Sequence, residues 1–235
     1  MSRLQNRMNQ SDHALVRAGS ERWTTSTVGN IAYSVATRLT VIRLAKENLE
    51  DLFRELGNDL KERRIEVKCR IDDPGSCFSL TNRELPFLLI AGFNSFLFEM
   101  RATYELTVEF VGRFLSDVIQ KPGVPKGKMR KRELHDLLVS EVTKRDARTE
   151  WINELRDNRG EFIHTITAWP AVMIHSIDPL RAEVMLLRGE DTGREDLSCY
   201  LSTTSVRDIY TGFRSTFTAV EKWLTCEIEE AEKAL

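Results

Sequence analysis

Hydrophobic residues recur at intervals of three and four along most of the chain, the spacing that collects them on one face of an α-helix. The first such pattern runs from about Ile31 to Arg64 and predicts a long amphipathic helix. Residues 1–27 are instead rich in Ser, Thr, Asn, Gln and Arg and have few apolar positions. They are therefore expected to form a polar N-terminal arm outside the main core.

A second long helix is predicted after the turn signal Asp72–Ser76. Residues 81–84 have the form of a capping box, and Pro86 falls in the first turn, where proline is tolerated. Residues 85–98 carry no charge and are apolar around most of the helix circumference. The helix should continue to about Ile119 and form the central element of the core. The uncharged run is shorter than the roughly 20 residues that span a bilayer, so no membrane association is expected.

The remainder of the chain predicts shorter helices over residues 133–143 and about 147–165, and a last helix from the N-cap Ser205 to about Ala231. Residues 183–187 and 199–202 are expected to pair as a small β-hairpin before that last helix. The sequence therefore predicts a mainly α fold, an antiparallel bundle with long core helices, in a single helical domain of residues 28–235.

Composition narrows the classes of function. The chain has 235 residues, 41% of them hydrophobic, which is enough for a sizeable core, and its formal net charge of -2 provides no bulk attraction to nucleic acid or an anionic membrane. The four cysteines show no CxxC spacing, and residues 1–10 lack the apolar core of a secretory signal, so reduced thiols and a cytoplasmic location are expected. His13, His135 and His175 lack neighbours at metal-ligand spacing, and no Gly-rich phosphate loop is present, so neither a metal nor a cofactor is predicted.

Arg159 is the position that most needs a chemical explanation. Ile152, Leu155, Phe162, Ile163 and Ile166 fall on one side of the predicted helix 147–165, and Arg159 lies in the middle of that stripe. A guanidinium that faces a core must be satisfied by a carboxylate, by carbonyls or by an anion in a pocket. Glu99, which interrupts the apolar second helix, is a candidate partner.

His164 lies five residues after Arg159, about 140° around a regular helix, so the two side chains do not point at one spot within one subunit. Two copies related by a twofold axis would bring Arg159 and His164 of both chains into one shared cleft.

The segment from Leu155 to His164, with Ala168-Trp169-Pro170 after it, resembles the HEPN (higher eukaryote and prokaryote nucleotide-binding) superfamily, all-helical domains with an Arg-x4-6-His motif. Arg159 and His164 match that motif, although Gly160 stands where the family usually has a polar residue. The resemblance covers roughly residues 80–230 and implies a HEPN-like bundle that acts as a homodimer.

Many members of this family are metal-independent ribonucleases of toxin–antitoxin, abortive-infection or CRISPR-associated defence systems, and others are inactive binding modules. The resemblance implies that His164 acts as general acid or base and that Arg159 stabilises the phosphate, with Asn158 and Arg156 as supporting contacts. RNA, and a cognate antitoxin or operon partner, are the partners it implies.

Two alternatives stay open. The chain could be a non-catalytic helical interaction module, a scaffold or regulatory partner, in which Arg159 is a structural residue paired with Glu99 or with helix carbonyls. The basic run from Lys126 to Arg132 is either a solvated loop or a patch that contacts RNA.

Overall fold

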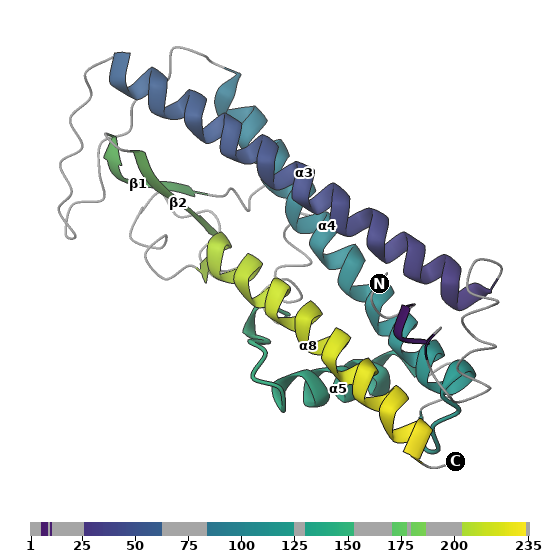
Figure 1. Cartoon of the computed structure of the whole chain (residues 1–235). Coiled ribbons are helices and arrows are strands. Elements are labelled where there is room, and N and C mark those ends of the chain that lie inside the picture. Colours follow the sequence, from purple (N-terminus) through teal and green to yellow (C-terminus); the bar gives the residue numbers. More distant parts are fainter. Residues whose placement is uncertain are drawn as a thin grey trace. The chain divides into compact units, whose positions relative to one another are not determined.

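The computed structural model describes residues 6–8, 10, 26–62, 84–124, 130–152, 171–177, 180–186 and 204–233. This part of the chain is mainly α-helical, as the sequence predicts (Figure 1). The long elements are the helices α3 (Thr27–Glu62), α4 (Leu85–Arg113), α5 (Arg130–Thr143) and α8 (Val206–Lys233), with a π-helical turn, η1 (Phe114–Val118), directly after α4.

The chain divides into two compact units that share its long helices. The first unit comprises Met1–Val41, Glu99–Thr149 and Gly212–Leu235, and the second comprises Ile42–Phe98 and Glu150–Thr211. Because α3, α4 and α8 each continue from one unit into the other, the units are not successive stretches of sequence.

Helix α3 begins with a side-chain cap. The Ser26 hydroxyl accepts a hydrogen bond from the Gly29 backbone N–H at 3.0 Å, which satisfies one of the free donors at a helix start. Five of its buried apolar residues recur every seven positions, the repeat that keeps one stripe of a long helix against a partner. They are Val28, Val35, Ile42, Leu49 and Leu56.

In the second unit, α3 packs closely against the first half of α4. A Cβ atom at Gly92 would lie 2.9 Å from Leu49 Cδ2, so the absence of a side chain there allows this approach. The rings of Phe53 and Phe93 meet edge to face with centroids 5.9 Å apart. Figure 1 shows α3 lying along α4.

The first unit joins the second half of α4 to α5 and α8. Fully buried side chains here include Phe110 and Phe114 before and in the π-turn, and Trp223 on α8. After α5, the Ser215 hydroxyl of α8 accepts a hydrogen bond from the Arg148 N–H at 3.1 Å, which fixes the segment that follows α5 against α8.

The start of the chain is more firmly attached than a polar arm implies. Residues 6–8 are helical, and Met8 is fully buried. Arg7 and Glu232 of α8 form a two-pronged ion pair, with Nη2 2.5 Å from Oε2. One apolar residue and one ion pair therefore hold this short segment within the first unit.

The sheet differs from the predicted hairpin. Strands β1 (Ala171–Ile177) and β2 (Leu180–Leu186) pair antiparallel, with Ala171 opposite Met185, and the two-residue strand β3 (Thr204–Ser205) pairs with the end of β2. Residues 183–187 were expected to pair with 199–202, which lie outside the described residues. The missed signal is the apolar run 171–177 followed by Asp178-Pro179, because turn residues between two strands favour a local hairpin.

Candidate functional site

Four of the five residues predicted for the site, Arg156, Asn158, Arg159 and His164, lie outside the described residues. The nearest described residues before them, 150–152, are helical, and Trp151 and Ile152 are buried. A helix was predicted from about Ala147, so the described helix begins three residues later than expected.

Glu99, the fifth predicted residue, forms an ion pair with Arg38, which is not among the predicted site residues. Its Oε2 accepts a hydrogen bond from Arg38 Nη1 of α3 at 2.5 Å, and its side chain is 19% exposed. Arg38 precedes Glu99 by 61 positions and lies on another helix, so no spacing rule connects the two. Glu99 is therefore neutralised within the first unit without Arg159.

A tyrosine and a histidine form a second polar contact, between α4 and α5. The Tyr104 hydroxyl lies 2.7 Å from His135 Nδ1, and the two rings pack edge to face with centroids 5.7 Å apart. Tyr104 is buried, with 7% of its surface exposed, while His135 is half-buried. The contact orients the imidazole and gives the buried phenol a hydrogen-bond partner.

The end of α4 is shaped by its π-turn. Ile119 N–H donates to Phe114 C=O at 3.0 Å, and Lys121 N–H donates to Leu115 C=O at 2.9 Å. Gln120 then adopts a left-handed conformation with φ 56°, which stops the helix and turns the chain. This geometry directs Lys121 toward α8.

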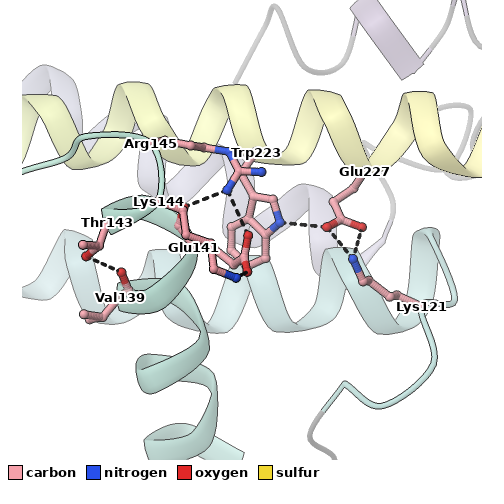
Figure 2. A network of polar contacts seen from close by, with 8 residues as sticks. All are labelled: Lys121, Val139, Glu141, Thr143, Lys144, Arg145, Trp223 and Glu227. Atoms are coloured by element: carbon pink, nitrogen blue, oxygen red, sulfur yellow. Dashed lines mark hydrogen bonds and ion pairs between the residues drawn. The ribbon is translucent and has the colours of Figure 1, made fainter.

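Lys121 meets a buried carboxylate on α8. Its Nζ lies 2.6 Å from both carboxylate oxygens of Glu227, whose side chain is only 8% exposed. Trp223 Nε1 donates to the same carboxylate at 2.8 Å, so three hydrogen bonds satisfy it (Figure 2). A buried charge needs such partners, and this arrangement fixes the end of α4 to α8.

Glu141 near the end of α5 is the centre of a neighbouring charge cluster (Figure 2). Its carboxylate is 2.5 Å from Lys144 Nζ and 2.9 Å from Arg145 Nη1. Partial burial raises the pKa of Glu141, but the hydrogen bonds and charges of Lys144 and Arg145 outweigh it, so the pKa lies below its usual range.

The Glu141 cluster should stabilise the fold in a pH-dependent way. Replacement of Glu141 by glutamine is expected to cost about 0.5–1 kcal/mol of unfolding free energy near neutral pH. Because the pKa is lowered on folding, this contribution is complete above the usual glutamate pKa of about 4.3 and is lost as pH falls through the lowered value. Urea unfolding over a pH series measures it.

Glu47→Gln provides the matched control, because the Arg43–Glu47 pair is more than half exposed on both sides and should contribute little at any pH. If the loss of unfolding free energy in Glu141→Gln stayed constant from neutral to strongly acidic pH, the ionised Glu141 carboxylate would not be its cause.

The described residues contain no cluster of three His, Cys, Asp or Glu side chains suited to a metal ion. None of the helices in the described ranges has the length and apolarity needed to cross a membrane. The chain matches no protein-family model, no curated protein and no solved structure.

Proposed function

We propose that this chain is a HEPN-like helical protein that binds RNA and cleaves it without a metal ion, as a homodimer of a toxin–antitoxin or phage-defence system. The observation that carries the proposal is the Arg159-x4-His164 motif on a predicted amphipathic helix. The mainly α-helical architecture, with a long apolar helix before the motif and a long helix after it, supports it.

The proposed chemistry assigns one role to each motif residue. His164 exchanges a proton with the RNA 2′-hydroxyl or with the leaving oxygen, since imidazole titrates near neutral pH. Arg159 stabilises the charge that develops on the phosphate through its planar pair of donors. Asn158 and Arg156 hold neighbouring phosphate oxygens.

RNA cleavage by the purified full chain in EDTA tests this proposal. The wild type should cleave RNA, and Arg159→Ala and His164→Ala should each reduce the rate at least about 100-fold, the contribution expected of one acid–base or electrostatic group. Circular dichroism verifies that each variant is folded.

Two control variants remove the same side-chain types elsewhere. Arg214→Ala removes an exposed arginine of α8, and His13→Ala removes a histidine of the polar N-terminal segment. Both should cleave like the wild type. Absence of cleavage by the wild type on varied RNAs, or full activity of both motif variants, would refute the ribonuclease proposal.

A second candidate function is a non-catalytic interaction module. The observation that favours it is the apolar surface of the long helices, where Tyr33, Phe87 and Phe98 are each more than half exposed. A folded wild type that neither cleaves nor binds RNA would favour this function.

A further inference from the structure

The basic run from Lys126 to Arg132 has no role in the chemistry proposed for Arg159 and His164. Five of its seven residues are Lys or Arg, and no Asp or Glu occurs between Asp117 and Glu133. The chain as a whole has a formal net charge of -2, so the residues outside the run carry -7, the difference between -2 and +5. Positive charge is therefore concentrated in this short run, although the bulk charge of the chain does not attract an anionic polymer.

The structure describes the last two side chains of the run, Lys131 and Arg132. Helix α5 begins at Arg130, so both lie in its first turn, and both are exposed. Within the part of the chain that the structure describes, neither side chain forms a hydrogen bond or an ion pair, although Asp136 follows one turn later. The described residues therefore do not neutralise these two charges.

Exposed cations on α3 have a different arrangement. Arg43 pairs with Glu47 and Lys46 pairs with Glu50, each four residues along the same helix. The two cations of α5 lack such partners, and in the first turn they also oppose the partial positive charge at the start of a helix. Helix stability therefore does not account for their presence, whereas contact with an anion does.

Packing on both sides of the run fixes the start of α5. Val124 before the run is 7% exposed, and Leu134 after it is 1% exposed. His135, the residue after Leu134, has its Nδ1 2.7 Å from the Tyr104 hydroxyl, which holds the start of α5 against α4. The two exposed cations therefore project from a helix that is anchored within the first unit.

We propose that the basic run is a contact surface for the phosphate backbone of RNA, with Lys131 and Arg132 each facing a phosphate. A polymer with regularly spaced anions suits several cations within a few residues, and such contacts neutralise phosphates without reading the base sequence. None of the exposed large hydrophobic residues in the described ranges lies on α5, so this surface offers no exposed Phe, Tyr or Trp ring for base stacking. The inference rests on the proposed RNA function for the identity of the polymer, and it adds a binding surface outside residues 156–164.

The packing of α5 disfavours other anionic partners. Leu134, Leu138 and Val142 are buried, and the described residues of α5 expose no large apolar side chain that could enter a lipid surface. An acidic protein partner would need apolar or aromatic anchors at the centre of the interface, and this surface exposes none. A nucleic-acid backbone requires neither, because interfaces with nucleic acid are polar and strongly positive.

Fluorescence anisotropy of the full chain with a labelled 2′-O-methyl oligouridylate of about 20 nucleotides tests this surface. The probe lacks the 2′-hydroxyl that the proposed cleavage uses, so binding is measured without turnover. The wild-type affinity should fall as salt rises from about 0.05 to 0.2 M. The double variant Lys131→Ala with Arg132→Ala should bind about tenfold more weakly at about 0.1 M salt. It should also reduce the slope of log affinity against log salt by about 1.4, since each phosphate contact on a single strand contributes about 0.7.

Arg43→Ala with Lys46→Ala is the matched control. It removes one arginine and one lysine from α3 and changes the net charge by the same amount, but both cations are already paired within their helix. This control should bind like the wild type. The exchange Lys131→Arg with Arg132→Lys keeps both charges and should also bind like the wild type, because the phosphates are recognised by charge. Circular dichroism verifies that each variant is folded.

Four results would overturn the proposal. They are a wild type that does not bind the probe, unchanged affinity and salt dependence in Lys131→Ala with Arg132→Ala, an equal loss in the α3 control, and wild-type binding to polyglutamate or phosphatidylserine vesicles as tight as to the probe. Cleavage of unmodified RNA in EDTA separates the two proposals. A wild type that binds through the basic run but does not cleave would refute the ribonuclease proposal alone, and one that cleaves RNA but binds the probe without Lys131 and Arg132 would refute this surface alone.

Discussion

Replacement of Trp223 by alanine is expected to lower the free energy of unfolding by about 3–5 kcal/mol. Trp223 is 1% exposed, so truncation leaves a large cavity in the first unit. The change also removes the Nε1–H that donates to Glu227 at 2.8 Å, which leaves a buried carboxylate with one donor fewer. Urea unfolding followed by circular dichroism measures the loss.

Trp223→Phe separates the two causes, because phenylalanine fills most of the space but cannot donate a hydrogen bond. Its expected cost is about 1–3 kcal/mol, the range for a lost hydrogen bond to a buried group. A smaller loss of unfolding free energy in Trp223→Ala than in Trp223→Phe would contradict the assigned cost of the cavity.

Replacement of Lys121 by methionine should cost about 2–3 kcal/mol, because Glu227 is then a buried carboxylate without its cation. The partial exposure of Lys121, 39%, keeps the expected loss below the 3–5 kcal/mol typical of a fully buried pair. Thermal and urea unfolding of the variant both report this loss.

The double variant Lys121→Met with Glu227→Gln tests the assigned cause. Removal of both charges should cost less than the sum of the two single changes, since the unpaired buried charge is gone. Lys144→Met is the matched control, because Lys144 is 63% exposed beside Glu141 and should lose less than about 1 kcal/mol. Additive losses at Lys121 and Glu227 would show that the two side chains do not act as a pair.

Helix positions were predictable because they depend on local periodicity. The apolar spacing around Ile31 to Arg64 predicted a helix that the structure places at Thr27–Glu62, and the segment after Ser205 predicted the helix Val206–Lys233. The predicted end of the second helix at about Ile119 also agrees with the left-handed Gln120. No recognisable sequence pattern predicts the π-helical turn η1 that precedes Gln120.

The candidate site was predictable only as a set of residue types. The Arg159-x4-His164 spacing is visible in the sequence, and its function stays a prediction. The partner of Glu99 was not predictable, because Arg38 lies on a different helix and is one of many arginines in the sequence. The pairing of β2 with β1 was not predicted, because the sequence analysis assigned no strand to residues 171–177.

The helices, their apolar stripes and the Arg159–His164 motif can be recognised from the sequence, since each depends on residues within a few turns of one another. The fold was needed to show which distant side chains meet: Arg38 with Glu99, Tyr104 with His135, and Lys121 with Glu227. It also left the Phe87–Phe98 side of α4 exposed. The physical reason is that hydrophobic periodicity fixes the face a helix buries, whereas the partner of that face depends on contacts between segments far apart in the chain.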